Sequence, residues 1–164
     1  MKILLLSTIL LWVNTFSQAQ VVQNRNVSPD DVKIRELVNK YIASLNNADS
    51  ISGYNLFAHS GKISFIHSRG NEQSWEEIKH NIYKFLGDIY SVRTFKIDYE
   101  DVWLLECAAR VVISYTFNVT SKKDNSNING TCIETQLWWK SNEEWKLSAV
   151  HDSNLNPNSG QQFF

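Results

Sequence analysis

The chain has 164 residues and a formal net charge of −1, with no run of basic residues. This balance excludes the positively charged surface that nucleic-acid-binding proteins present to phosphates, so we expect no nucleic-acid partner. Aromatic residues make up 12% of the chain, which is high for a small protein and favours a hollow or an adhesive surface over a purely aliphatic core.

The first nineteen residues have the pattern of a cleaved signal peptide. Lys2 gives a positive start, and residues 3–13 form an apolar run that is short for a membrane-spanning helix. Ser17 and Ala19 are small residues at the two positions that a signal peptidase reads. We therefore predict cleavage after Ala19 and export to the periplasm or the medium of a bacterium. The alternative is an uncleaved membrane anchor.

About 145 residues remain after cleavage, which is a common size for one domain. We predict a flexible segment at 20–28, a folded domain at 29–153 and a flexible tail at 154–164. After signal cleavage no further segment is apolar enough for a membrane partner.

Cys107 and Cys132 are expected to stay unpaired and buried. If the strands near 110–120 and 128–140 form a hairpin, the two residues lie roughly 30 Å apart along the ladder. Bridged Cα atoms must approach within about 7 Å. A disulfide is the alternative, because export implies an oxidising compartment.

Three helical segments precede most of the strands. Ser28 and Pro29 begin the first helix as an N-cap and a first-turn proline, and Asn46–Asn47 end it. A weaker helix covers residues 50–58. Ser74 and Glu77 have the spacing of a capping box, which opens a third helix that stops at Gly87.

Alternating apolar residues predict the strands. Residues 62–68 form a first strand, and residues 92–106 form a long strand with an irregularity near Glu100–Asp101. In the last three strands we place the odd-numbered side chains on one shared inner face, because we expect odd positions to pair with odd positions across both hairpins. These inner positions are 109–119, 133–139 and 145–153.

This order of elements predicts an α+β domain in which a curved antiparallel sheet packs against about three helices and encloses a cone.

The final hairpin carries the clearest resemblance to a known family. It reads Thr135-x-Leu137-x-Trp139, then Trp145-x-Leu147, then His151-x-Ser153, and it follows a long first helix and a glycine-bearing loop before a capped helix. This pattern, over residues 30–153, resembles the nuclear-transport-factor-2-like (NTF2-like) superfamily, and within it the SnoaL-like or DUF4440-type domains.

The resemblance implies a conical barrel, often homodimeric, with a pocket between sheet and helices. Members include ketosteroid isomerase, polyketide cyclases and dehydratases, so the fold alone does not fix a reaction. The isomerase uses a carboxylate base with a tyrosine and a protonated acid as oxyanion donors. Asp98, Glu100 and Asp101 lie in the long strand, but none follows a motif that matches those residues.

His151 is the best catalytic candidate, because imidazole titrates near neutral pH and can act as a general base or bind a ligand. The alternative is a structural histidine. We predict that a cone pocket is lined by Tyr41, Phe65, His67, Tyr83, Tyr115, Phe117, Trp139, His151 and Ser153. His67 could meet His151 across the cone, but the histidines and cysteines lack metal-ligand spacing. We therefore predict no metal and no cofactor.

Trp138 is predicted to face outward, because Trp139 is placed inward. An exposed tryptophan on a sheet is typical of an interface. We predict a sheet-to-sheet homodimer through Val112, Glu134, Trp138 and Val150.

Three functions follow from these observations. The first is an exported domain that binds a small, largely hydrophobic ligand in the cone. The second is an isomerase, cyclase or dehydratase that uses His151 or a strand carboxylate as its base. The third is a homodimeric protein-interaction module.

Overall fold

The computed structural model describes residues 28–59 and 62–155. The predicted signal peptide, most of the segment 20–28 and most of the predicted tail lie outside these residues. The helical elements are α1 (Pro29–Asn47), α2 (Ser50–Leu56), α3 (Trp75–Ile78), the π-helical turn η1 (Lys79–Lys84) and α4 (Phe85–Ile89). The strands are β1 (Ser64–His67), β2 (Gly70–Glu72), β3 (Tyr90–Leu104), β4 (Ala108–Ser121), β5 (Asn127–Ser141) and β6 (Glu144–Asn154).

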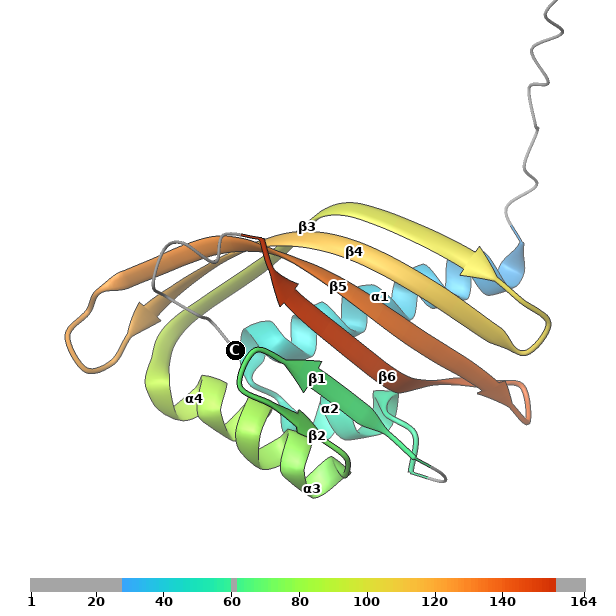
Figure 1. Cartoon of the computed structure of the whole chain (residues 1–164), viewed down its shortest axis with the longest axis horizontal. Helices are drawn as coiled ribbons and strands as arrows, with labels where there is room; N and C mark the ends of the chain where they lie inside the picture. The colour runs from blue at the N-terminus through green and yellow to red at the C-terminus, as the bar shows by residue number, and fades with distance from the viewer. Residues whose placement is uncertain (1–27, 60–61, 156–164) are drawn as a thin grey trace, which may run out of the picture.

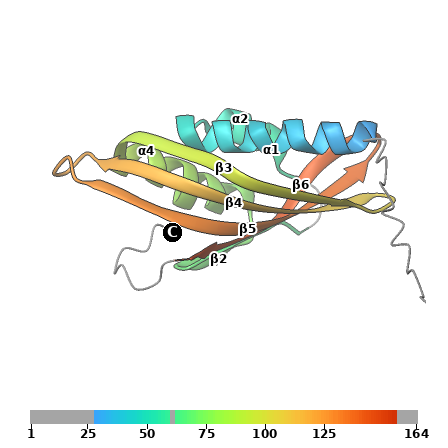
Figure 2. The same ribbon diagram turned by 90° about the horizontal axis from the view of Figure 1, so that it is seen from above.

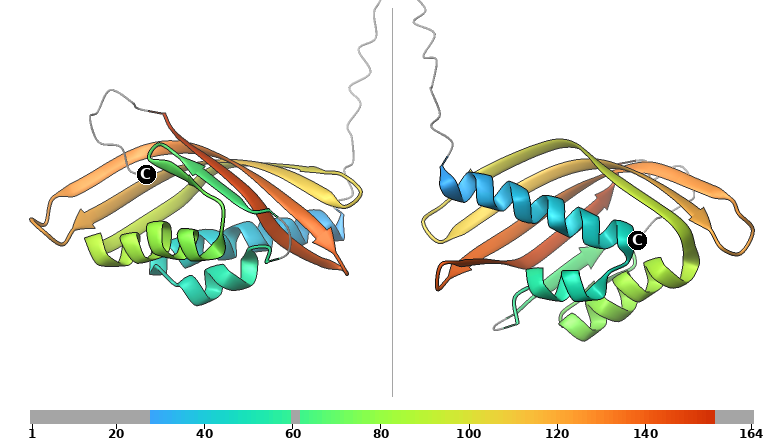
Figure 3. Two further views of the ribbon diagram at one scale, coloured as in Figure 1. Left: turned by 60° about the horizontal axis from the view of Figure 1, so that its bottom comes forward. Right: turned by 180° about the vertical axis from the view of Figure 1, so that it is seen from behind.

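The six strands form one curved, unclosed sheet in the order β2-β1-β6-β5-β4-β3. All neighbours are antiparallel except β1 and β6, which run parallel, so the sheet is mixed and not purely antiparallel as predicted. Figures 1 and 2 show α1, α2 and the α3–η1–α4 helix on the concave side of the long strands. Figure 3 shows the same arrangement from two further sides. The α+β cone fold is therefore confirmed.

The helix starts follow the capping chemistry of the sequence. The Ser28 hydroxyl accepts a hydrogen bond from the Asp31 amide at 3.0 Å, and Pro29 occupies the first turn. The Ser74 hydroxyl accepts from the Glu77 amide at 3.3 Å. α3, η1 and α4 continue one another from residue 75 to residue 89, which matches the third predicted helix. Within the described ranges no helix has the length and apolar character needed to cross a bilayer.

The turn between β4 and β5 sets which side of β5 faces the helices. Ser121 and Ser126 close this turn, and Val119 pairs with Ile128, so odd positions of β4 pair with even positions of β5. β4 buries its odd-numbered residues as predicted, and β5 therefore buries Cys132, Glu134, Gln136 and Trp138. The prediction that the odd-numbered residues of β5 face inward is wrong, because odd positions of β4 pair with even positions of β5.

β6 changes its inner face halfway along. A two-residue turn at Asn142 and Glu143, both with positive φ, gives a second odd–even register and places Trp145 and Leu147 inside. A register shift opposite Leu137 and Trp138 then places Val150 and Asp152 inside. His151 and Ser153 are exposed as a result, so their predicted inward orientation is wrong.

Both cysteines are free, as the ladder distance predicted. Cys132 is buried, but Cys107 is exposed in the turn before β4, so the expectation of two buried thiols is wrong for Cys107. The irregularity in β3 lies between Ile97 and Tyr99, slightly before the predicted position.

The contact between α2 and the third helix gives a test of packing. A methyl group added at Gly53 would overlap the ring and hydroxyl of Tyr83, whereas one at Gly87 would lie 3.5 Å from the Ala48 side chain, an ordinary contact. We expect Gly53→Ala to lower the free energy of unfolding by about 1–3 kcal/mol through overpacking. Gly87→Ala, the matched control, should raise it by about 0.5–1 kcal/mol. Urea denaturation of both variants measures this, and equal effects in the two variants would contradict the packing described.

Candidate functional site

Two carboxylates face each other inside the cone. Glu134 on β5 and Asp152 on β6 are cross-strand partners, and their exposed fractions are 0% and 6%. Tyr41 from α1 donates its hydroxyl to Glu134 at 3.0 Å, and Tyr115 from β4 donates to Asp152 at 2.7 Å. Each acid therefore has a tyrosine donor from a different element.

The two acids take up protons far more readily than exposed carboxylates do. Burial, together with the charge of Asp152, raises the pKa of Glu134 to about 8. Burial raises the pKa of Asp152 to about 6, against the opposing effect of the hydrogen bond from Tyr115. At neutral pH the pair therefore carries a proton, since two adjacent buried carboxylates cannot both be charged at low cost.

A chain of side-chain hydrogen bonds continues from Glu134 along β5. Gln136 donates to Glu134 at 2.6 Å, and Trp138 donates to Gln136 at 2.7 Å. Burial raises the pKa of Tyr41 and of Tyr115 well above the usual value, so both remain hydroxyl donors. These polar groups satisfy one another, which is what allows them to be buried.

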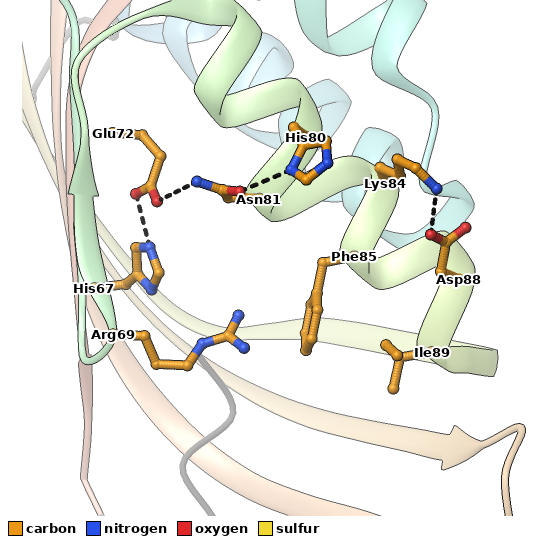
Figure 4. Close-up of a pocket in the computed structure, with 9 residues that line it drawn as sticks. All are labelled: His67, Arg69, Glu72, His80, Asn81, Lys84, Phe85, Asp88 and Ile89. Atoms are coloured by element: carbon orange, nitrogen blue, oxygen red, sulfur yellow. Dashed lines mark hydrogen bonds and ion pairs between the residues drawn. The ribbon is translucent and has the colours of Figure 1, made fainter.

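A cleft opens at the rim of the cone, between the β1–β2 hairpin and the η1–α4 part of the helix. Its volume is about 330 Å³, which is at the lower end of the range for small-molecule sites. Its lining residues are His67, Arg69, Glu72, His80, Asn81, Lys84, Phe85, Asp88 and Ile89 (Figure 4).

A buried histidine–carboxylate pair lies in the wall of this cleft. His67 Nε2 lies 2.7 Å from Glu72 Oε2, and both side chains are less than a tenth exposed. Asn81 Nδ2 donates to the other oxygen of Glu72 at 3.1 Å, which joins the hairpin to the helix. Glu72 thus fixes the orientation of the imidazole, an arrangement that suits a ligand-binding or proton-accepting histidine.

The mouth of the cleft combines charge with apolar surface. The Arg69 guanidinium carbon lies 4.1 Å from the centre of the Phe85 ring. Lys84 forms an ion pair with Asp88 one helical turn away, and Ile89 lies beyond it (Figure 4).

Local structure explains why these residues converge. Ser68 and Arg69 form the turn of the β1–β2 hairpin, and Phe65 pairs with Glu72, so His67 and Glu72 are diagonal neighbours on one face. On the other wall, His80, Asn81 and Lys84 belong to the π-helical turn η1. π-helical turns are frequent at functional sites.

The predicted cone-pocket residues separate into three groups: those that line a cavity, those buried in the core and those exposed on the outer face. His67 lines the cleft, and Tyr83 lines a different cavity of about 370 Å³ beside α2. Trp139 is half exposed and lines an outer cavity of about 600 Å³. The core group is Tyr41, Phe65, Tyr115 and Phe117. His151 and Ser153 are exposed on the opposite side of β6.

The four cavities that we describe do not include Glu134 or Asp152 in their linings. The fourth measures about 490 Å³ and lies along α1 and α2. His67 and His151 do not meet across the cone, since His67 is buried inside and His151 is exposed outside.

The residues predicted for the dimer interface face the wrong way. Glu134 and Trp138 are fully buried and Val150 is 1% exposed, so they belong to the core. Val112 alone is partly exposed. The cause is again the odd–even register of β5, which turns Trp139 outward and Trp138 inward.

Glu72, Asn81 and Arg69 are not among the site residues predicted from the sequence. The available signal was the two-residue turn that follows His67, since such a turn places Glu72 on the same face as His67. Among residues 28–59 and 62–155, no group of three His, Cys, Asp or Glu side chains is placed to hold a metal ion.

Comparisons with known proteins identify the family. No family model and no curated protein matches the sequence. An NTF2-like superfamily protein from Salmonella enterica serovar Typhimurium is 31% identical, with a TM-score of 0.72; the match covers 79% of this chain and 96% of that one. The chain therefore belongs to the NTF2-like superfamily.

Two more distant structures share the fold alone. A putative dehydratase of the NTF2-like family from Streptomyces avermitilis is 14% identical, with a TM-score of 0.69, over 78% of this chain and 99% of that one. A hexachlorocyclohexane dehydrochlorinase from Novosphingobium barchaimii is 10% identical, with a TM-score of 0.67, over 82% and 94%.

The acid pair predicts an unusual pH dependence. The folded-state pKa of Glu134 lies above its unfolded value near 4.3, so unfolding releases a proton between these values. The free energy of unfolding should therefore fall as the pH rises from about 4 to about 8. A pKa difference of this size corresponds to a fall of roughly a few kcal/mol.

Glu134→Gln should remove most of this fall, while Glu106→Gln, at an exposed position, should leave it unchanged. Urea denaturation at a series of pH values measures the effect. A wild-type protein that gains stability between pH 5 and pH 8 would contradict a buried, proton-sharing pair.

Proposed function

We propose that this protein binds a small molecule in the cleft between the β1–β2 hairpin and the η1–α4 helix. The observation that carries the proposal is the buried His67–Glu72 pair in the wall of a cleft of about 330 Å³. A concave site with a few convergent polar groups on an apolar background is the usual form of a ligand site.

The geometry supports a site at the rim of the cone and not at its centre. The interior positions are occupied by Tyr41, Tyr115 and the acid pair, which hydrogen-bond to one another. The cleft, in contrast, combines the imidazole of His67 with the ring of Phe85. The ligand that we propose is therefore amphipathic, and not the largely hydrophobic one expected from the sequence.

Export is part of the proposal. It rests on the signal-peptide pattern of residues 1–19, with cleavage after Ala19. A periplasmic or secreted protein would meet its ligand outside the cytoplasm.

Acid–base catalysis is a second candidate function, and the 2.7 Å contact between His67 and Glu72 favours it. A carboxylate that orients an imidazole also stabilises the imidazolium formed when the histidine accepts a proton. Enolising isomerisation, aldol-type cyclisation and β-elimination of water are reactions in which a base removes a proton from a carbon acid. In this proposal His67 replaces His151 as the base.

We also propose that the protein forms a homodimer through the outer face of the sheet. Ile133, Leu137 and Trp139 lie on the outer side of β5, with Thr135 between the first two, and their exposed fractions are 37%, 41% and 50%. Trp103 on β3, 56% exposed, lies on the far side of Arg110 from Leu137, and Arg110 contacts its ring. Several large apolar side chains exposed on one face of a sheet are typical of an interface.

Native mass spectrometry of protein purified from its own cell envelope tests ligand binding and export together. We expect a chain that begins at Gln20 and carries a retained small molecule. His67→Ala should lose most of that molecule, because the variant removes a polar group from the cleft wall. His151→Ala, on the outer face, should retain it. Loss of the molecule from His151→Ala alone would contradict a site at the cleft.

Sedimentation velocity tests the dimer. We expect a dimer at micromolar concentration for the wild type and a monomer for Trp139→Glu, because a buried unpaired charge opposes association. Ile51→Glu replaces a side chain that is 77% exposed on α2 and should leave the dimer intact. A wild-type protein that stays monomeric at high micromolar concentration would refute this interface.

A further inference from the structure

We infer that the cleft selects small carboxylates with an apolar body, and that Arg69 is the residue that determines this specificity. The inference rests on the proposed binding function and adds the chemical class of the ligand. It follows from how the charged groups of the cleft are paired.

Arg69 lies at the cleft mouth against the ring of Phe85 (Figure 4). Its guanidinium carbon lies 4.1 Å from the centre of the Phe85 ring, within the range of a cation–π contact. A guanidinium carries five N–H donors in one fixed planar fork. These donors can pair with the two oxygens of a carboxylate in the bidentate geometry that arginine favours.

The other charged groups of the cleft already have partners. Lys84 pairs with Asp88, and Glu72 accepts from both His67 and Asn81. Arg69, by comparison, forms no hydrogen bond or ion pair with the residues that the structure describes. Among the charged groups of the cleft, Arg69 is therefore the one whose donors are left for a ligand, which favours an anion at this end of the cleft.

The apolar part of the ligand follows from the opposite wall of the cleft. Phe85 and Ile89 lie on the helix, and His67 and Arg69 both lie on the hairpin that faces it (Figure 4). A ligand whose carboxylate meets Arg69 would place its apolar body against Phe85 and Ile89 and its remaining polar atoms toward His67. A single guanidinium suits a carboxylate better than a doubly charged phosphate, which usually gathers several donors.

Two probes of nearly equal shape, 3-phenylpropionate and 3-phenylpropionamide, test this inference. Binding to the mature protein is followed through the backbone amide NMR signals of residues 67–72 and 80–89. We expect both probes to shift these signals, with the carboxylate binding at least about tenfold more tightly, as one charge-assisted hydrogen bond allows.

Arg69→Gln should weaken carboxylate binding by about tenfold or more and leave the amide unchanged. Lys79→Gln is the control, because it removes an exposed cation from the helix that carries Phe85 but lies outside the cleft lining. This variant should change neither affinity by more than about twofold. A preference for carboxylate that survives in Arg69→Gln would overturn the inference.

The two proposals fail in different ways. If both probes shift the cleft signals with equal affinity, the cleft binds ligands but does not select carboxylates. If the matched dianion 2-phenylethylphosphonate binds far better than the carboxylate, the selected class is wrong. If no probe shifts the cleft signals, the cleft is not the ligand site and the proposed function fails as well.

Discussion

The burial of Glu134 opposite Asp152 is the constraint on which the interior of this protein depends. Two carboxylates on neighbouring strands can be buried only if they hold a proton and receive donors, and Tyr41 and Tyr115 supply those donors at 3.0 and 2.7 Å. One donor comes from α1 and the other from β4, so the acid pair joins the first helix to the sheet. The centre of the cone is therefore a polar network that belongs to the fold.

This filled centre explains why the candidate site lies at the rim. The short β1–β2 hairpin joins the sheet through a parallel contact with β6, which places Phe65 beside Val150 in the core. The next inward side chain of β1 is His67, which meets Glu72 where the hairpin faces η1. The core thus fixes one wall of the cleft, and the π-helical turn that carries Asn81 fixes the other.

The sequence predicts much of this fold but not the phase of its last strands. Ser28 and Ser74 mark helix starts through local capping chemistry, and the structure confirms both. The inner face of β5 depends instead on the closure of a turn several residues away, and that of β6 on a register shift inside the strand. Glu134 illustrates the difficulty, because a carboxylate flanked by apolar residues suggests an exposed position.

The candidate site was predicted only in part for the same reason. His67 is recognisable as a chemically useful residue on an apolar strand, but its partner Glu72 becomes visible only once the two-residue turn between them is known. Arg69 looks like an ordinary loop residue until its contact with Phe85 is seen. The most direct test of the cleft is a crystal structure of the protein with the molecule that it retains from its own cells. The structure described here predicts that molecule between His67 and Phe85, and a molecule bound at the outer cavity beside Trp139 would contradict it.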